Sequence, residues 1–421
     1  MSGEASTSRR RVRLKYLAKL NPPVPACVAD DLEVSFLPME AIGEDGSLDL
    51  SRRRPAREVR SSYSYFADGD VAYAKVTPCF ENGKGAVMRG LASGHGFGTT
   101  ELTVMRPTGA AHTHFLNYVL SSQPFRQGGA GAMTGAGGLK RVPDKFAANF
   151  VVVLPSTEEQ AALVAKLDRE TARIDALIEK KTRFIELLRE KRQALITQAV
   201  TQGLDASVPM KDSGVEWLGR VPAHWEVLNF QRVVAIAEGQ VDPEQEPYRS
   251  MLLIAPNHVE SGTGRLIARE SAVEQRAESG KYQCNVGDVV YSKIRPALRK
   301  ACIAPESCLC SADMYPLRGI KGMTNPYLLW FLLSEPFSAF AVLEADRVAM
   351  PKINRDSLSR LKVPLPPTSE QAAICAKVGQ MTSSIDRLID RTNKSVALLA
   401  ERRSALITAA VTGQIDLREA A

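Results

Sequence analysis

A segment of 52 residues occurs twice in this chain, 211 residues apart, and the two copies align without a gap. The first copy runs from Leu154 to Asp205 and the second from Leu365 to Asp416, and about half of the paired positions are identical. Both copies keep many residues that a helix would turn outward, which suggests that each copy meets the same kind of partner. The repeat period far exceeds that of solenoid proteins, so it indicates duplication of a whole half-molecule.

Each copy is predicted to form one long helix. Both begin with a helix-start signal, LPSTEEQ or LPPTSEQ, in which Thr157 or Thr368 would cap the helix and Gln160 or Gln371 would complete a capping box. Apolar residues then recur at spacings of seven, which is typical of a coiled coil. The predicted seams are Leu163, Leu167, Ile174, Leu177, Phe184, Leu188 and Leu195 in the first copy, and Ile374, Val378, Met381, Ile385, Leu388, Leu399 and Leu406 in the second.

Weaker similarities indicate that a globular domain before each helix is duplicated too. GDVAYAKVTP (69–78) resembles GDVVYSKIRP (287–296), TELTVMRP (100–107) aligns with ADMYPLRG (312–319), and QPF (123–125) aligns with EPF (335–337). The alternation in DVAYAKV and DVVYSKI predicts strands, with Tyr73 and Tyr291 in the core. The stretches HTHFLNYVLSS and NPYLLWFLLSE predict short buried helices.

These patterns predict five consecutive segments. They are a globular domain at 1–153, a long helix at 154–205, a linker at 206–226, a second globular domain at 227–364 and a second long helix at 365–421. The linker contains Trp217, and Trp225 lies at its end, where polar residues would be usual. We therefore expect both tryptophans to anchor the second domain to the long helices.

The bulk composition permits several functions. A net charge of +7 and a pI near 9.0 suit a polyanionic partner such as nucleic acid, although many soluble proteins are mildly basic. The seven cysteines are scattered and form no CxxC pair, which argues against a disulfide framework and a structural zinc site. The start of the chain is polar and basic, and no apolar run of membrane-spanning length follows, so we expect a cytoplasmic protein that does not bind a membrane.

In its motifs and their order, the chain resembles the DNA-specificity subunit of type I restriction-modification systems. The resemblance is carried by the two PxTxEQ helix starts, the two ALIT-x-AVT helix ends and the central stretch MKDSGVEWLGRVPAHWEV (210–227), and it covers nearly the whole chain. It implies an α+β fold in which two duplicated α/β target-recognition domains are separated by two long antiparallel coiled-coil helices. Each domain would read one half of a split DNA site.

The resemblance also implies the partners. They would be double-stranded DNA, two modification (methyltransferase) subunits that dock on the helices, and restriction subunits that carry out translocation and cleavage. S-adenosylmethionine, ATP and magnesium would belong to those partner subunits, with no cofactor in this chain.

Eight basic residues are predicted to contact DNA, because Lys and Arg side chains bind phosphates and base edges. Lys75 and Lys293 occupy matching positions on the repeated strand, and Arg295 follows on the same face. The loops before the long helices, GAGGLKRV (135–142) and VAMPKIN (348–354), add Lys140, Arg141 and Lys352. Arg52 and Arg53 open a basic run that is followed by tyrosines. Each group also has a competing explanation. The strand lysines would simply lie on a solvated strand face, the loops before the helices would be flexible turns, and the arginine run would be an ordinary charged loop.

The sequence gives little support for a catalytic function or a metal site. NPPV (21–24) resembles an amino-methyltransferase motif but has Val24 where an aromatic ring would stack on a flipped base. His112, His114, Cys308 and Cys310 lack the spacing of a four-ligand metal site. Two alternatives stay open: a specificity subunit of a related restriction-modification class, and a coiled-coil scaffold that does not bind DNA. Salt-dependent binding to duplex DNA would separate the scaffold from the others.

Overall fold

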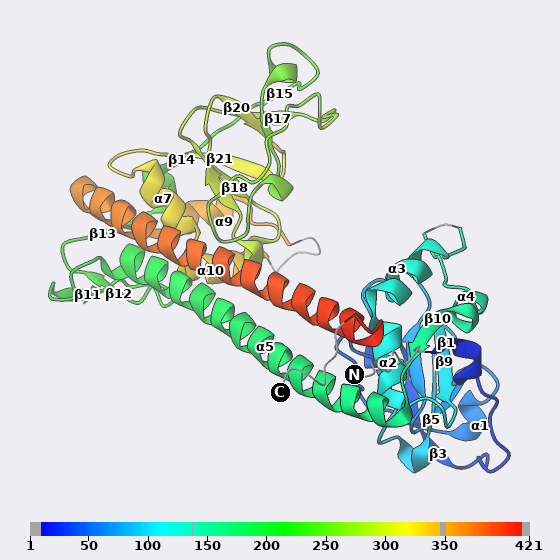
Figure 1. Cartoon of the computed structure of the whole chain (residues 1–421). Coiled ribbons are helices and arrows are strands. Elements are labelled where there is room, and N and C mark those ends of the chain that lie inside the picture. Colours follow the sequence, from blue (N-terminus) through cyan, green and yellow to red (C-terminus); the bar gives the residue numbers. More distant parts are fainter. Residues whose placement is uncertain (1–9, 137, 346–350, 415–421) are drawn as a thin grey trace, which may run out of the picture. The chain divides into compact units, whose positions relative to one another are not determined.

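The computed structural model of the chain describes residues 10–136, 138–345 and 351–414. Internal contacts divide the chain into two compact units: unit 1 is Met1–Thr182 together with Lys394–Ala421, and unit 2 is Arg183–Asn393. Two long helices, α5 (Thr157–Gln202) and α10 (Thr368–Val411), each begin in one unit and end in the other (Figure 1). The last predicted residues of the second helix, 415–421, lie outside the described residues.

Unit 1 contains two four-stranded sheets, ordered β2-β9-β6-β7 and β4-β3-β8-β5. All pairings in these sheets are antiparallel except that of β3 with β8. The strands are β1 (Arg10–Arg13), β2 (Ala18–Leu20), β3 (Glu33–Leu37), β4 (Arg53–Pro55), β5 (Ser64–Ala67), β6 (Val71–Ala74), β7 (Gly85–Val87), β8 (His95–Gly98), β9 (Leu102–Pro107) and β10 (Val151–Leu154). The helices before α5 are α1 (Ala56–Val59), α2 (Thr113–Ser121), α3 (Gln123–Gly131) and α4 (Asp144–Asn149).

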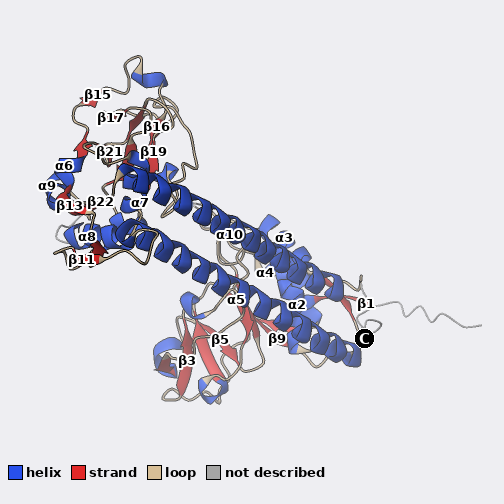
Figure 2. Cartoon of the chain, turned by 90° about the vertical axis from the view of Figure 1, so that its left-hand side faces the viewer, coloured by secondary structure: helices blue, strands red, loops and turns tan. Residues whose placement is uncertain are grey.

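Unit 2 repeats this design with sheets ordered β14-β21-β18-β19 and β15-β17-β20-β16. Its strands are β11 (Met210–Asp212), β12 (Arg220–Pro222), β13 (Glu226–Asn229), β14 (Val234–Ile236), β15 (Gln240–Val241), β16 (Leu253–Ile254), β17 (Lys281–Cys284), β18 (Val289–Ser292), β19 (Ala301–Ile303), β20 (Cys308–Cys310), β21 (Met314–Gly319) and β22 (Lys362–Leu365). Its short helices are α6 (Phe230–Val233), α7 (Asn325–Leu332), α8 (Glu335–Ala345) and α9 (Arg355–Arg360). The strands and helices of both units are visible in Figure 2.

The two units differ at the edge of their second sheet. In unit 1 the edge strand β4 pairs with β3, whereas in unit 2 the edge strand β15 pairs with β17, on the other side of the sheet. The basic run that contains β4 therefore has no structural counterpart in unit 2.

The repeated GDV turns begin equivalent inner strands, β6 and β18. Asp70 accepts two hydrogen bonds from Arg106, each 2.7 Å long, and Asp288 accepts two from Arg318, 2.8 and 2.9 Å long. Both aspartates are almost fully buried. Each bidentate pair ties the start of one inner strand to its neighbour, which explains why Gly-Asp-Val recurs in both halves.

The repeated tyrosines lie in the core, as predicted. Tyr73 packs edge-on against Phe125 at a centroid distance of 5.4 Å, and Tyr291 packs in the same way against Phe337 at 5.3 Å. The two phenylalanines come from the QPF and EPF motifs at the starts of α3 and α8. The preceding helices, α2 and α7, are mostly buried, which confirms the two predicted short helices.

Helices α5 and α10 run antiparallel. In unit 1 Asp175 of α5 pairs with Arg403 of α10, and in unit 2 Arg192 of α5 pairs with Asp386 of α10. From the first pair to the second, the position rises by 17 in α5 (192 − 175) and falls by 17 in α10 (403 − 386). Figures 1 and 2 both show the two helices side by side. The two pairs are the same repeat positions with the helices exchanged.

The coiled-coil seam exists, but parts of its predicted register are wrong. Leu177, Phe184 and Leu388 are exposed, whereas their neighbours Ile185 and Ile389 are buried or half-buried. Isoleucine follows each misassigned residue, so the spacing of apolar residues allows two registers that differ by one position. The neighbouring helix and globular domain select the observed one.

The predicted capping boxes are also wrong, because the glutamines of both helix starts turn into the protein. In α5 the box is formed instead by Ser156 and Glu159, with hydrogen bonds of 3.0 and 3.2 Å. Gln160 is fully buried and binds the backbone of residues 110, 112 and 155. Gln371 binds the equivalent backbone at residues 322, 324 and 366. Each glutamine therefore joins a long helix to the globular domain before it.

Replacing Gln371 with leucine should lower the free energy of unfolding by about 2–4 kcal/mol, because buried backbone groups lose their partners. Denaturant unfolding of the full chain, followed by tryptophan fluorescence, would measure this change. The control is Gln380→Ala on the exposed face of α10, for which a change within about 0.5 kcal/mol is expected. Equal stability of the leucine variant and the parent chain would refute the role assigned to Gln371.

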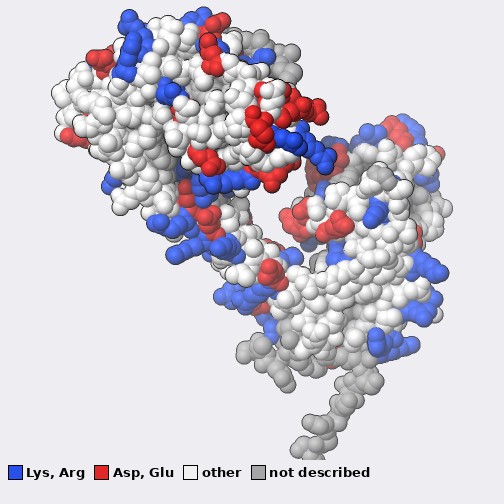
Figure 3. All heavy atoms as spheres, turned by 90° about the horizontal axis from the view of Figure 1, so that it is seen from above, with Lys and Arg blue, Asp and Glu red and all other residues white. Residues whose placement is uncertain are grey.

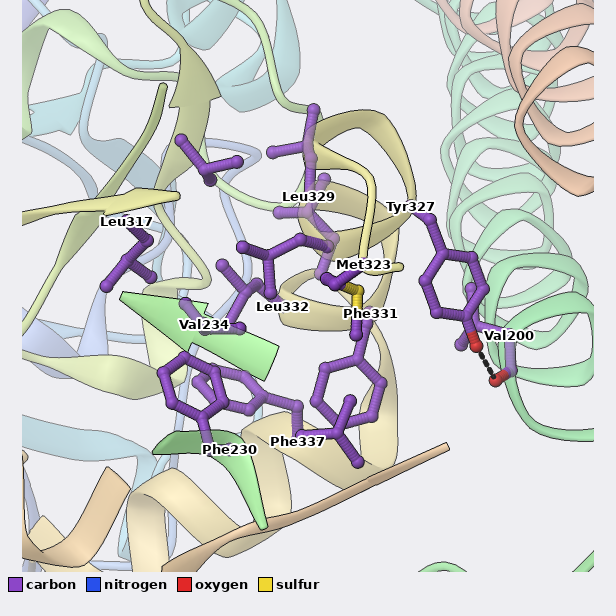
Figure 4. Close-up of a cluster of buried hydrophobic side chains, with 14 of the residues drawn as sticks. Val200, Phe230, Val234, Leu317, Met323, Tyr327, Leu329, Phe331, Leu332 and Phe337 are labelled. Atoms are coloured by element: carbon purple, nitrogen blue, oxygen red, sulfur yellow. Dashed lines mark hydrogen bonds between the residues drawn. The ribbon is translucent and has the colours of Figure 1, made fainter. Parts of the chain in front are cut away.

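The ends of both helices pack against the globular domain of the unit in which they end. Ile196, Val200 and Ala199 of α5 lie in the core of unit 2, and their repeat equivalents Ile407, Val411 and Ala410 lie in the core of unit 1. The hydroxyl of Tyr327 donates a hydrogen bond of 2.9 Å to the carbonyl of Val200 (Figure 4). The similarity of these helix ends thus follows from internal packing, which corrects the expectation that the repeated residues face outward toward a partner.

The threonines of the two ALIT motifs make one further equivalent contact. Thr197 accepts a hydrogen bond of 3.1 Å from the backbone amide of Glu335, and Thr408 accepts one of 3.0 Å from that of Gln123. Both donors lie in the first turn of a short helix, where backbone amides have no partner within the helix. The threonines therefore cap α8 and α3 from the long helices.

Trp225 anchors the globular domain of unit 2 to the long helices, as predicted for both central tryptophans. Trp225 is fully buried in the core that contains the end of α5 and the start of α10, and its indole nitrogen donates to Glu370 at 3.1 Å. His224 contacts the same carboxylate at 2.9 Å. Trp217 is only partly buried and packs against Phe340.

Candidate nucleic-acid interface

In unit 1 the chain just beyond β6 pairs with the loop before α4, and the two segments form one basic edge. The amide of Val142 donates to the carbonyl of Lys75 at 2.8 Å, and the amide of Thr77 donates to that of Lys140 at 3.0 Å. We call residues 75–77 and 140–142 the first basic edge. It brings together three of the predicted DNA-binding residues, Lys75, Lys140 and Arg141.

Unit 2 builds the same arrangement from different residues. The amide of Ile353 donates to the carbonyl of Lys293 at 2.9 Å, and the amide of Arg295 donates to that of Pro351 at 3.2 Å. We call residues 293–295 and 351–353 the second basic edge. It brings together the predicted residues Lys293, Arg295 and Lys352, while residues 348–350 of the predicted loop lie outside the described residues.

The side chains of the first basic edge surround one carboxylate. Arg141 donates two hydrogen bonds to Glu101, 2.8 Å from Nε and 2.6 Å from Nη2. The Arg141 guanidinium holds the pKa of the Glu101 carboxyl below its usual range, and the charge of Lys75 adds to this effect. Lys140 is exposed. The edge thus presents two lysines beside an arginine that is held in place.

In the second basic edge the strand lysine contacts an aromatic ring. The ammonium of Lys293 lies 5.1 Å from the ring centre of Tyr315, a cation–π distance. Arg295 is exposed and its φ angle is +48°, in the left-handed region of backbone conformation. Lys352 is also exposed. Among the described residues, no hydrogen bond or ion pair engages the side chains of Arg295 and Lys352.

Comparison with known proteins gives a consistent result. A family model described as the type I restriction modification DNA specificity domain matches residues 225–397. The EcoDI specificity subunit of Escherichia coli is 29% identical over 279 residues, which are 63% of this chain and 62% of that protein. The EcoEI specificity subunit of Escherichia coli is 39% identical over 163 residues, which are 38% of this chain and 27% of that protein.

Two solved structures share the fold over nearly the whole chain. One belongs to a type I restriction-modification system studied for its complex assembly and conformational transition, with a TM-score of 0.72, 18% identity, and coverage of 96% of this chain and 98% of that one. The other is the HsdS subunit from Thermoanaerobacter tengcongensis, with a TM-score of 0.51, 18% identity, and coverage of 96% and 97%. The chain is therefore similar to type I restriction-modification specificity subunits, in sequence over residues 225–397 and in fold over nearly its whole length. It spans 62% and 27% of the length of the two curated relatives named above.

Arg52 and Arg53 do not belong to the first basic edge, because β4 and β6 lie in different sheets of unit 1. Arg53 is the first residue of β4, in the second sheet of unit 1, and Arg52 precedes it. Arg52 pairs with Glu40 at 3.0 Å, and Arg53 lies 4.0 Å from Glu33. Both side chains remain more than half exposed, so their contact with DNA stays a prediction.

On the face of the molecule shown in Figure 3, charge alone does not mark an interface. On the face shown in Figure 3, Lys and Arg side chains lie in separate groups among Asp and Glu side chains rather than in one continuous patch. The two basic edges were found because the sequence repeats, and because each pairs a strand end with a loop. Glu101 was missed, although the aligned motifs TELTVMRP and ADMYPLRG place an acidic residue, Glu101 or Asp313, at the same position.

The described residues were also searched for metal sites and for helices of membrane-spanning length. Within 10–136, 138–345 and 351–414, no group of three or more His, Cys, Asp or Glu side chains could hold a metal ion. In the same ranges no single helix has the length and apolarity of a membrane span, and one bent pair, α7 with α8, meets that test by length and composition only.

Proposed function

We propose that this chain is a non-catalytic, sequence-specific DNA-binding subunit that recognises a split, interrupted DNA site. It would direct adenine methylation and restriction by the partner subunits of a type I complex in the cytoplasm. The observation that carries the proposal is the construction of the same basic edge twice, with equivalent backbone pairing and unlike side chains. Equivalent backbones with different side chains suit two recognition domains that read two different half-sites.

The partners are proposed from the duplicated surface of the long helices. Leu187 of α5 and Leu398 of α10 occupy equivalent repeat positions and are 46% and 64% exposed. Leu177 and Leu388 form a second equivalent exposed pair. Each unit therefore presents one leucine of each pair on its part of the helices. Two like apolar surfaces support the docking of two modification subunits, to which restriction subunits would be added.

The cofactors of the assembled complex are assigned to its other subunits. S-adenosylmethionine would serve the modification subunits, and ATP and magnesium would serve the restriction subunits. The chain described here would contribute recognition and assembly only.

The proposed function is tested by sequencing the native DNA of the host for modified adenines, with the gene intact and deleted. Loss of methylation at one interrupted motif on deletion is the expected result, and it would reveal both half-sites. An unchanged pattern would count against the function. Duplex binding by the assembled complex then separates a silent DNA-binding system from a scaffold, since binding through phosphates weakens steeply as salt rises.

Replacing Leu187 or Leu398 with glutamate should remove one modification subunit from the complex, and the double variant should remove both. A buried carboxylate without a partner is unfavourable in an apolar interface. Native mass spectrometry of the co-expressed complex gives the stoichiometry directly. The matched control is Val286→Glu, an exposed apolar position that is not part of either long helix. Retention of both modification subunits in the double variant would contradict the docking site.

A further inference from the structure

Arg141 in the first basic edge is fixed at both ends of its side chain. Its backbone forms two hydrogen bonds with Thr134, 2.8 and 3.0 Å long, and lies between the segment of residue 134 and that of Val76. Its guanidinium is held by the two hydrogen bonds to Glu101. The side chains of Arg141 and Glu101 are 47% and 27% exposed, so the carboxylate lies deeper and the guanidinium faces solvent. This is a preorganised donor on the surface.

The hydrogen bonds to Glu101 leave one edge of the guanidinium available. A guanidinium has five N–H groups in a planar fork, and Glu101 occupies the edge made by Nε and Nη2. Among the described residues, no hydrogen bond engages Nη1. The edge made by Nη1 and Nη2 can therefore offer two parallel hydrogens to one ligand. Two adjacent acceptors, N7 and O6, are what guanine presents in the major groove.

The carboxylate beside Arg141 also argues against a phosphate contact. Glu101 is held in its charged form, since the guanidinium lowers its pKa. A fixed negative charge at hydrogen-bond distance offsets the attraction of Arg141 for a phosphate, whereas the neutral edge of a base is not repelled. The exposed neighbour Lys140 has no such carboxylate within the described hydrogen bonds and ion pairs, and is the better phosphate ligand of this edge.

We propose that Arg141, positioned by Glu101, reads a guanine in the half-site bound by unit 1. The inference rests on the proposed function and adds the identity of one base and of the residue that reads it. Glu101 acts as a positioning residue, through Arg141. The second basic edge has Lys352 and Asp313 at the equivalent places. Because a lysine offers no planar fork, the half-site bound by unit 2 should not be read in the same way.

The test uses the complete complex with its modification subunits and the split motif found for the parent complex. Arg141→Lys keeps the charge and removes the fork, so discrimination at one guanine should fall about 5- to 150-fold, with the other half-site unchanged. Glu101→Gln should relax the same position to a smaller extent. The control is Lys140→Ala, which should weaken binding to all sequences alike and lower the slope of log affinity against log salt by about 1.

A purely structural role for the Arg141–Glu101 pair predicts a different outcome. Both variants would then lose affinity for every sequence together with thermal stability, without a change at any single base. That result, or relaxation in the other half-site, would overturn the inference while leaving the proposed function intact. Absence of any sequence preference in the parent complex would instead refute the function itself.

A measurement on the parent complex guards against variants that fail to fold. Replacing each guanine of the motif in turn by 7-deazaguanine removes the N7 acceptor without altering base pairing. Affinity should fall at one guanine of the half-site bound by unit 1, and this loss should disappear in Arg141→Lys. Equal affinity for all substituted duplexes would overturn the inference.

Discussion

Replacement of Trp225 by alanine should lower the free energy of unfolding of unit 2 by about 3–5 kcal/mol, as for other large side chains removed from a close-packed core. The indole is fully buried and packs among residues from the end of α5, the start of α10 and α7. It also holds the carboxylate of Glu370, which would lose one hydrogen-bond donor.

Hydrogen exchange of the full chain would show which helices lose stability when Trp225 is replaced. Amides of α7 should exchange faster in Trp225→Ala, while those of α2 in unit 1 should keep the protection of the parent chain. The matched control is Trp217→Ala, because that indole is only partly buried, against Phe340; its effect should be less than half as large. If both variants lose the same protection, the assignment of Trp225 as the main anchor is wrong.

Much of the fold could be predicted because the chain contains two copies of one design. The repeat predicted long helices at 154–205 and 365–421, and the structure has α5 from Thr157 to Gln202 and α10 from Thr368 to Val411. The paired GDV, QPF and EPF motifs predicted the duplicated domains, since a motif that occurs twice at matching places is unlikely to arise from chance. The two halves of the chain could be aligned with each other, and this alignment identified the equivalent positions.

Predictions failed where a residue type fits two environments. The glutamine of each helix start suits a capping box and also a buried hydrogen-bond hub, and only the neighbouring domain decides between them. In the seam, Phe184 is followed by Ile185, so apolar spacing cannot tell which of the two faces α10. Such choices depend on tertiary packing, which local spacing does not encode.

Part of the candidate interface could also be predicted from the internal repeat. Repetition identified Lys75 with Lys293 and matched the two loops before the long helices. The structure places the two lysines on equivalent backbone, and it shows that Arg141 of the first loop corresponds to Lys352 of the second. The sequence did not show that Arg141 is held by Glu101, because 40 residues separate them. Nor did it show that Arg52 and Arg53 have carboxylate partners within their own sheet region.

Replacing Asp386 with asparagine should destabilise unit 2 by about 3–5 kcal/mol, because it leaves a buried guanidinium without its counter-charge. Arg192 is only 7% exposed in its side chain, and Asp386 is 17% exposed. Arg192 also donates to the carbonyls of Gly262 and Thr263 at 2.6 and 3.2 Å, so it holds a loop of the globular domain against the long helices. Loss of the carboxylate should therefore loosen that loop as well as the helix pair.

The repeat supplies the matched control, Asp175→Asn, which breaks the equivalent pair in unit 1. There the side chains of Arg403 and Asp175 are 32% and 49% exposed, and an ion pair in contact with water contributes only about 0–1 kcal/mol. Denaturant unfolding, with hydrogen exchange to assign the loss to a unit, should thus give a large effect for Asp386 and a small one for Asp175. Equal effects would show that burial does not decide the strength of these two pairs. The expected difference would mean that one sequence motif, used twice, forms a buried pair that also bonds the globular domain in unit 2 and a partly exposed pair in unit 1.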